Sequence, residues 1–285
     1  MKQTNKNHET ILVLGGTGKT GSRVAHRLTE LGYTVRLGSR KSELPFDWEN
    51  AATWEPVLQN IDSVYITFQP DLALPGADEM IAAFSKLAVD NGVKKLVLLS
   101  GRGEPEARRC ENMVMEAGAD WTIVRASWFM QNFNESHLLE PILAGYVSLP
   151  VGDVGEPFID ADDIADVAVA ALTQRGHSGK VYEVTGPRLI TFREAVAEIA
   201  AASGRNIHYE QISLDKYTAM LEAYGVPEVV TSLLTYLFTE VLDGRNAMLM
   251  DGVQQALGRT PVDFSTFVHK YAEQGLWQPA RALTI

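Results

Sequence analysis

The sequence predicts an α/β protein built on a Rossmann-type, doubly wound parallel sheet, with a smaller and mostly helical C-terminal domain. Strand-like and helix-like segments alternate through the first two thirds of the 285 residues, which is typical of a parallel sheet covered on both faces. A glycine-rich turn at residues 15–21 directly follows the first apolar run. Beyond residue 191, helical periodicity predominates.

Each expected element of the first part has its own signal. Residues 11–14 and 95–100 are apolar runs, as expected for buried parallel strands. Val24 and Leu28 recur at helical spacing, as do the apolar residues of 78–91. The expected strands cover residues 11–14, 34–37, 63–68, 95–100, 121–124 and 180–184. The expected helices between them cover residues 22–31, 52–59, 78–91, 106–117 and 160–172.

The alternation loosens after Arg125, and the last third is expected to be helical. Its expected helices cover residues 192–202, 214–224, 227–242 and 264–273. The turn signal at Gly186-Pro187 marks a boundary. We therefore expect a first domain of residues 1–186 and a second domain of residues 187–285.

The turn at residues 15–21 has the character of a dinucleotide-binding turn. Gly16, Gly18 and Gly21 fall at the corner between strand and helix, where the backbone can approach a pyrophosphate at a helix N-terminus. We expect the following residues to bind the cofactor there: Gly15, Thr17, Gly18, Lys19, Thr20 and Gly21. One alternative is a purely structural turn. The other is a triphosphate-binding loop, but that loop needs a glycine where the chain has Val13.

The end of the second expected strand indicates which dinucleotide is bound. A carboxylate about 20 residues after the glycines would bind the ribose 2′-hydroxyl of NAD. The chain has Ser39, Arg40 and Lys41 there instead. A hydroxyl group and two cations favour the 2′-phosphate of NADP(H), which we expect Ser39 and Arg40 to bind. The alternative is an exposed charged turn without a ligand.

Two further strand ends open toward the same edge of the predicted sheet, where ligands of open α/β sheets bind. Phe68 and Gln69 end the third strand, and Ser100 and Gly101 end the fourth. We expect all four to line the cofactor site. The alternatives are that Phe68 belongs to the core and that Ser100 caps the following loop.

Composition and charge exclude several partners. The chain is 46% hydrophobic and 21% charged, without an apolar run of membrane-span length, and its polar N-terminus lacks a signal core. We therefore expect a cytoplasmic protein with no membrane partner. The net charge of −11 disfavours binding to nucleic acid. The single cysteine, Cys110, and six scattered histidines lack the spacing of metal ligands, so we expect no metal.

Two groups of charged residues have more than one interpretation. The carboxylates of Asp160, Asp162 and Asp163 directly precede an apolar helix, where helix capping explains them better than a metal or acid/base site. The second group comprises Glu104, Glu106, Arg108, Arg109 and Glu111, which are expected to form a solvated helix face rather than a catalytic set.

Several short motifs follow one another along nearly the whole chain. They lie at residues 15–21, 98–101, 111, 121–125, 129–132, 158–165, 182–186 and 257–261. By their order and spacing the chain resembles the NmrA-like atypical short-chain dehydrogenase/reductases, of the triphenylmethane reductase and agroclavine dehydrogenase type. The resemblance implies that residues 1–186 bind NADP(H), with 129–157 contributing to the substrate side, and that residues 187–285 bind the substrate. It also implies a catalytic role for Ser100.

The usual proton relay of short-chain dehydrogenases is absent from this chain. That relay needs a tyrosine followed four residues later by a lysine, and none of the nine tyrosines is followed in this way. Ordinary ketone chemistry is therefore less favoured than hydride transfer to an imine, an iminium ion, a quinone or a dye-like aromatic acceptor. Trp128, Phe129 and Tyr217 are expected to contact such a flat substrate, the alternative being that they belong to the core.

Two functions fit these observations. The first is an NADPH-dependent reductase, monomeric or homodimeric, of a small aromatic or heteroaromatic substrate. The second is a non-catalytic NADP(H) sensor that binds a protein partner. An enzyme needs a closed pocket over the nicotinamide, whereas a sensor needs a surface that changes with the redox state of the cofactor.

Overall fold

The computed structural model describes residues 9–278, which fold into two compact units. Unit 1 contains the chain up to residue 126, residues 161–184 and residues 250–260. Unit 2 contains residues 127–160, residues 185–249 and the chain from residue 261 onward. Residues 127–160 thus group with the helical part, whereas residues 250–260 return to unit 1. The assignment of cofactor binding to one part and substrate binding to the other stays a prediction.

Unit 1 contains a six-stranded parallel sheet in the order β2-β1-β3-β4-β5-β7. The strands are β1 (Thr10–Leu14), β2 (Thr34–Gly38), β3 (Ser63–Ile66), β4 (Lys95–Gly101), β5 (Asp120–Ala126) and β7 (Lys180–Val184). The strand order reverses between β1 and β3, which is the place where open α/β sheets bind ligands. The predicted Rossmann-type fold is confirmed.

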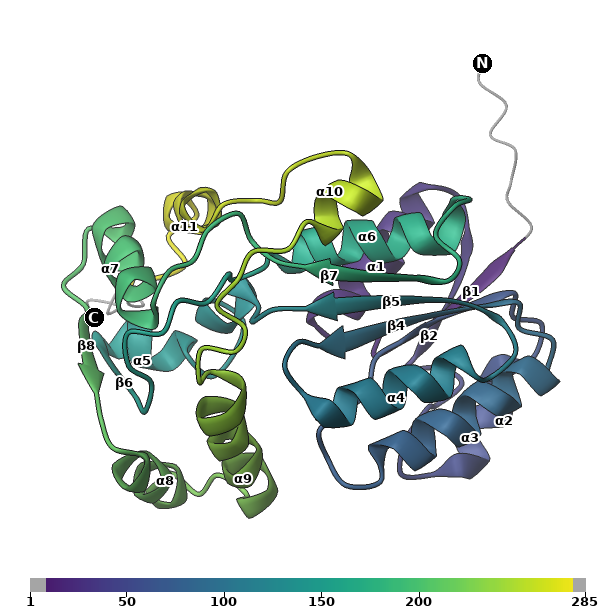
Figure 1. Cartoon of the computed structure of the whole chain (residues 1–285), viewed down its shortest axis with the longest axis horizontal. Helices are drawn as coiled ribbons and strands as arrows, with labels where there is room; N and C mark the ends of the chain where they lie inside the picture. The colour runs from purple at the N-terminus through teal and green to yellow at the C-terminus, as the bar shows by residue number, and fades with distance from the viewer. Residues whose placement is uncertain (1–8, 279–285) are drawn as a thin grey trace, which may run out of the picture. The chain divides into compact units, whose positions relative to one another are not determined.

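Helices cover both faces of this sheet (Figure 1). One face carries α1 (Lys19–Glu30) and α6 (Ala161–Thr173), which pack against each other. The other carries α2 (Trp54–Leu58), α3 (Ala77–Asp90) and α4 (Pro105–Met115). The short helix α10 (Gly252–Leu257) packs against α6 and β7. Because α6 lies among the sheet, α1 and α10, it is apolar nearly all round, as its many buried alanines show.

An aromatic cluster beneath the β3 loop fixes the end of that strand. The Trp48 ring lies 5.0 Å from Phe46, 5.2 Å from Phe84 and 5.8 Å from Trp54, measured between ring centroids. Its indole N–H donates to the carbonyl oxygen of Thr67 at 3.0 Å. The cluster therefore ties the first residue after β3 to the core.

Unit 2 is mostly helical, as expected. Its helices are α5 (Leu139–Ala144), α7 (Phe192–Ser203), α8 (Leu214–Ala223), α9 (Glu228–Tyr236) and α11 (Phe264–Glu273). A 3₁₀ turn covers Met130–Phe133, and a π-helical turn at Leu237–Val241 follows α9 within the expected helix 227–242. Two short strands, β6 (Tyr146–Leu149) and β8 (His208–Gln211), pair in parallel. The core contains phenylalanines, with the Phe158 ring 5.0 Å from Phe192 and 5.3 Å from Phe133.

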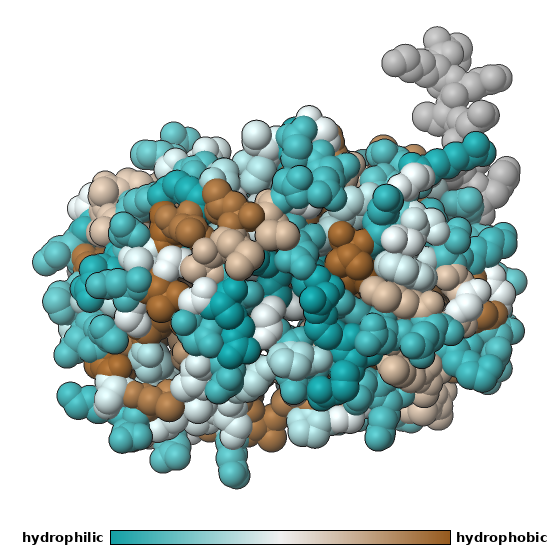
Figure 2. Space-filling model, viewed as in Figure 1, coloured by the Kyte–Doolittle hydropathy of each residue, from teal (hydrophilic) through white to brown (hydrophobic). Residues whose placement is uncertain are grey.

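The face of the molecule drawn in Figure 2 is largely polar. Hydrophilic residues cover most of the face drawn in Figure 2, with hydrophobic residues scattered among them. Within residues 9–278, no helix combines the length and the apolar character needed to cross a bilayer.

Candidate functional site

In the glycine turn of unit 1, the backbone is closely packed against itself and against the residue that follows β3. Gly15 adopts a left-handed conformation (φ 61°), and its N–H donates to the carbonyl oxygen of Gly38 at 2.9 Å. A Cβ atom on Gly15 would lie 2.3 Å from Oγ1 of Thr67, and one on Gly21 would lie 2.2 Å from the carbonyl oxygen of Gly15. Side chains at these two positions would force the turn apart, so the sequence needs glycine at both.

The N-terminus of α1 opens at this turn. Its N-cap residue is Gly18, which has no side chain to cap the helix, and the first turn of the helix contains no acidic residue. The backbone N–H groups and positive end of the helix therefore suit an anion. This geometry fits the pyrophosphate of a dinucleotide. Thr17 is exposed and Lys19 is partly exposed at the turn, whereas Thr20 is buried and faces the interior.

The basic residues after β2 divide into two groups. Arg36 donates to the carbonyl oxygens of Val57 and Gln59, at 2.9 Å and 2.7 Å, and thus holds the end of α2. Arg40 and Lys41 are exposed, and neither has a hydrogen bond or an ion pair within the part of the chain that the structure describes. These two cations are available for an external anion.

Ser39 shapes the turn that presents these cations. Its hydroxyl group lies 2.8 Å from the hydroxyl group of Ser42, and its carbonyl oxygen accepts from the N–H groups of Ser42 and Phe46. The hydroxyl group of Ser39 is half-buried and already has a partner. Ser39 therefore stabilises the turn, and its predicted contact with a phosphate would be a second function of the same hydroxyl group.

Gln69 lies beside the glycine turn, as the predicted site requires. Its side-chain nitrogen would be 3.8 Å from a Cβ atom on Gly18, and the residue is exposed. Phe68 is half-buried, and its ring packs 5.0 Å from the Trp48 ring. Phe68 therefore belongs at least in part to the aromatic cluster, in agreement with its alternative interpretation.

A row of polar residues crosses the sheet near its carboxyl edge. Ser100 on β4 is in register with Arg125 on β5, which is in register with Glu183 on β7. The Ser100 hydroxyl donates to Oε1 of Glu111 at 2.7 Å, from α4. Since the hydroxyl proton already has a buried acceptor, Ser100 is fixed in place by Glu111, and its catalytic role stays a prediction.

Glu111 corrects the expectation of a solvated helix face. Its side chain is only 2% exposed and accepts two hydrogen bonds from Arg125, Nε to Oε1 at 2.8 Å and Nη2 to Oε2 at 2.5 Å. Arg125 also pairs with Glu183, which lies 3.4 Å from Nε of Arg102. Burial opposes the charge of Arg125, but the hydrogen bonds to both glutamates raise its pKa above the usual value. The buried network holds the ends of β4, β5 and β7 together.

Glu104, at the start of α4, is also buried. A Cβ atom on Gly101 would lie 2.3 Å from Oε1 of Glu104, so the carboxyl group rests on the backbone where β4 ends. Gly101 therefore accommodates this carboxyl group, a function that nothing in the sequence pattern indicates.

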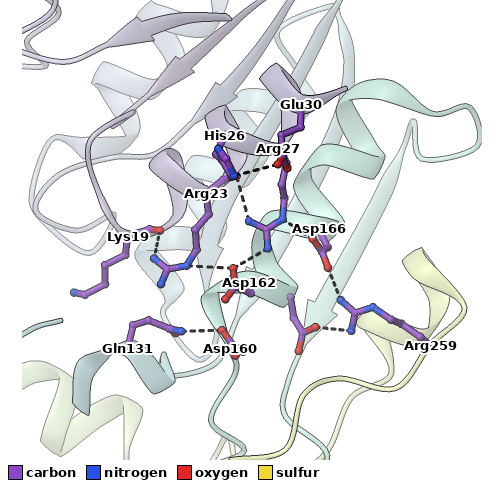
Figure 3. A network of polar contacts seen from close by, with 11 residues as sticks. Lys19, Arg23, His26, Arg27, Glu30, Gln131, Asp160, Asp162, Asp166 and Arg259 are labelled. Carbon is purple, nitrogen blue, oxygen red and sulfur yellow. Dashed lines mark hydrogen bonds and ion pairs between the residues drawn. The ribbon is translucent and has the colours of Figure 1, made fainter. Parts of the chain in front are cut away.

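The acidic residues at the start of α6 form ion pairs (Figure 3). Asp162 accepts from Nη2 of Arg27 at 2.7 Å, and Asp166 accepts from Nε of the same arginine at 2.6 Å. Arg259 donates to Asp163 at 2.6 Å and to Asp166 at 2.5 Å. Helix capping alone was therefore an incomplete explanation of this group. In residues 9–278 there is no set of three or more histidine, cysteine or acidic side chains placed to bind a metal.

The predicted substrate residues lie in unit 2. The Trp128 ring is partly exposed and packs 5.5 Å from both Phe192 and Phe238. Phe129 is partly exposed. Tyr217 is only 3% exposed, packs 5.3 Å from Phe238, and has a pKa that burial raises to about 12. Most of the Tyr217 side chain is therefore part of the core, in agreement with its alternative interpretation.

The fold and the glycine turn are those of a nucleotide-binding protein of the Rossmann class. A sequence model described as NAD(P)H-binding matches residues 15–175, and the chain belongs to this family. The resemblance to the NmrA-like atypical short-chain dehydrogenase/reductases is confirmed. The protein is an NAD(P)H-dependent oxidoreductase.

Individual relatives extend over nearly the whole chain. It is 32% identical over 273 residues to the uncharacterized oxidoreductase YesF of Bacillus subtilis, covering 92% of this chain and 95% of that protein. It is 31% identical over 287 residues to NAD(P)H azoreductase of Xenophilus azovorans, covering 92% and 98%. The structure of Citrobacter sp. triphenylmethane reductase complexed with NADP(H) is similar in fold, with a TM-score of 0.72, 19% identity and coverage of 92% and 99%.

Proposed function

We propose that this protein is an NADPH-dependent reductase of small aromatic or heteroaromatic acceptors that accept hydride readily. The observation that carries the proposal is the glycine turn at the N-terminus of α1, which fits a pyrophosphate, in a chain without a tyrosine–lysine relay. When bound, the reduced nicotinamide supplies a hydride. The acceptors are imines, iminium ions, quinones and dye-like molecules.

The two free cations after β2 support NADPH over NADH. Arg40 and Lys41 are exposed and have no protein partner within the described residues, so an arriving 2′-phosphate does not have to break an existing ion pair. A planar guanidinium group also matches the geometry of a phosphate. In our proposal Arg40 makes the principal contact, with Ser39 beside it.

Replacement of Arg40 by alanine is expected to weaken NADPH binding by about 10- to 100-fold, because a charge-assisted hydrogen bond contributes about 1.5–3 kcal/mol. NADH, which lacks the 2′-phosphate, should bind as before. Cofactor fluorescence titration measures both affinities. Lys86→Ala is the matched control, because it removes an exposed cation on α3 whose partner is Asp90. An unchanged ratio of the two affinities in Arg40→Ala would contradict the NADPH assignment.

The remaining cofactor contacts are proposed at the carboxyl edge of the sheet, and the substrate contacts are proposed in unit 2. Gln69, beside Gly18, is proposed to contact the cofactor. Trp128 and Phe129 are partly exposed and are proposed to contact the flat substrate, with Tyr217 supporting them from the core. A relative named as an azoreductase supports an aromatic acceptor.

The acceptor class is tested by following NADPH absorbance with a cyclic imine, a quinone, an azo dye, a triarylmethane dye and a simple ketone. Turnover of at least one activated acceptor, at least about 100-fold faster than the ketone, is expected, because an activated acceptor takes up hydride more readily than a simple ketone. A ketone reduced as fast as every activated acceptor would contradict the proposal. Tight NADPH binding with no turnover of any of them would favour the redox sensor.

A further inference from the structure

Two acidic side chains meet at the carboxyl edge of the sheet in unit 1. Asp71 lies in the loop after β3, and Glu104 lies in the loop after β4. These strands are neighbours, with Ile66 opposite Leu98, so both loops leave the sheet at the edge where open α/β folds bind their ligands.

The two carboxyl groups are hydrogen-bonded to each other. Glu104 is only 7% exposed and its carboxyl group rests on the backbone of Gly101. Oδ1 of Asp71 accepts from the N–H of Ala73 at 2.8 Å. Within residues 9–278 neither carboxyl group has an ion pair with an arginine or a lysine. Two carboxylates cannot hydrogen-bond without a proton between them, so one member of the pair is protonated.

The surroundings keep that proton on Glu104. Burial and the Asp71 carboxylate, with smaller contributions from Glu106 and Glu111, raise the pKa of Glu104 to about 9. The cations on the same helix have acidic partners. Nη2 of Arg109 lies 3.5 Å from Oε1 of Glu106, and Nη1 of Arg108 lies 3.9 Å from Oε2 of Glu111. Glu104 is thus a neutral acid at neutral pH and becomes a carboxylate only as the pH rises through about 9.

We propose that Glu104 donates the proton that completes the reduction of neutral acceptors, and that Asp71 holds Glu104 in its protonated form. This inference rests on the proposed reductase function. Hydride addition brings two electrons to the acceptor and leaves negative charge on its nitrogen or oxygen. The O–H bond of Glu104 breaks, the proton goes to that atom, and the Glu104 carboxylate then takes a proton from water. The carboxyl pair thereby supplies the proton that a neutral acceptor takes up after hydride transfer.

The charge of the acceptor separates this role from a structural one. A neutral imine or azo compound needs one hydride and one proton. A triarylmethyl cation or an iminium ion needs only the hydride, because its reduction neutralises an existing positive charge. Loss of a proton donor therefore slows the first group and spares the second.

Glu104→Gln tests the proposal, because glutamine keeps the shape and can still donate to Asp71 but carries no transferable acid proton. Reduction of a neutral imine or azo dye is expected to fall by about 10²- to 10⁴-fold, while reduction of a triarylmethane dye stays within about threefold. Glu79→Gln, which changes an exposed glutamate on α3, is the matched control and should affect neither. The proposal would be overturned if Glu104→Gln reduced both kinds of acceptor as fast as the wild-type protein. It would also be overturned if both rates fell equally while NADPH binding stayed intact.

Two further measurements do not depend on the Glu104→Gln activity. The infrared band of a protonated carboxyl group should be present in the protein without cofactor at neutral pH, should vanish in Glu104→Gln and should persist in Glu79→Gln. Asp71→Asn should shift the alkaline loss of this band to lower pH, because it removes the carboxylate that raises the pKa of Glu104. Absence of the band in the wild-type protein would overturn the proposal. Its presence in a protein that reduces no acceptor would instead show that the reductase function has failed while the proton-sharing pair exists.

Discussion

Replacing Glu111 by alanine is expected to lower the free energy of unfolding by about 3–5 kcal/mol, because one partner of a buried ion pair is removed. Glu111 accepts from Ser100 and twice from Arg125, and each of the three side chains is at most 6% exposed. Without it, the Ser100 hydroxyl loses its acceptor and Arg125 retains only Glu183. Denaturant unfolding followed by circular dichroism measures the change.

Glu116→Ala is the control, because this residue lies at the exposed C-terminal end of the same helix. It should change stability by no more than about 0.5 kcal/mol. If Glu111→Ala had an effect as small as that of Glu116→Ala, the polar row across β4, β5 and β7 would not contribute to stability as described.

Arg259→Ala is expected to destabilise the protein by about 3 kcal/mol, because it removes a cation from a buried carboxylate. Arg259 donates to Asp163, whose side chain is fully buried, and to Asp166 on the next turn of α6. Within unit 1, these bonds hold residues 250–260, which include α10, against α6. The unfolding free energy is again the quantity to measure.

Arg245→Ala is the matched control for this second substitution. Arg245 is 38% exposed and Arg259 is 41% exposed, but the partners of Arg245 are the exposed residues Asp243 and Glu240. An exposed pair contributes at most about 1 kcal/mol, so the control should have a small effect. Equal effects of the two variants would show that the buried carboxylate does not depend on Arg259.

Local sequence patterns were sufficient for most of the regular elements. Each strand of the large sheet overlaps a range in which the sequence predicted a strand, and the glycine turn joins β1 to α1 as its spacing indicated. The strands β6 and β8 were not predicted, because each has only four residues and pairs with a partner about 60 residues away in sequence. Helix α10 was also missed, since it is short and packs on α6 and β7 rather than on its neighbours in sequence.

The sequence contains an indication that Glu111 is buried, although the many charged residues around it suggested an exposed helix face. It lies on the same face of α4 as Ala107, Cys110 and Val114, all of which are fully buried. Its partner Arg125 ends an otherwise apolar strand, which also indicates a buried charge that needs a counter-ion. Helical periodicity was therefore the signal that could have indicated the burial of Glu111, whereas only the fold shows that the two residues meet.

The carboxyl pair could not be predicted from the sequence in the same way. Asp71 and Glu104 are 33 residues apart in loops whose conformation has no periodic signal, and their contact depends on the neighbouring positions of β3 and β4. The sequence did show the absence of a tyrosine–lysine relay, but it did not indicate that another side chain supplies a proton.

The most direct test of the reductase assignment is to follow the hydride itself. NADPH carrying deuterium at the transferable C4 position is incubated with the protein and a triarylmethane dye or a cyclic imine, and the product is analysed by mass spectrometry. A reductase transfers one deuterium atom to the reduced carbon, with one equivalent of NADPH consumed for each product molecule. Tight binding of NADPH without any deuterated product, across both acceptors, would contradict the reductase assignment and would identify the protein as a binder of the cofactor rather than a reductase.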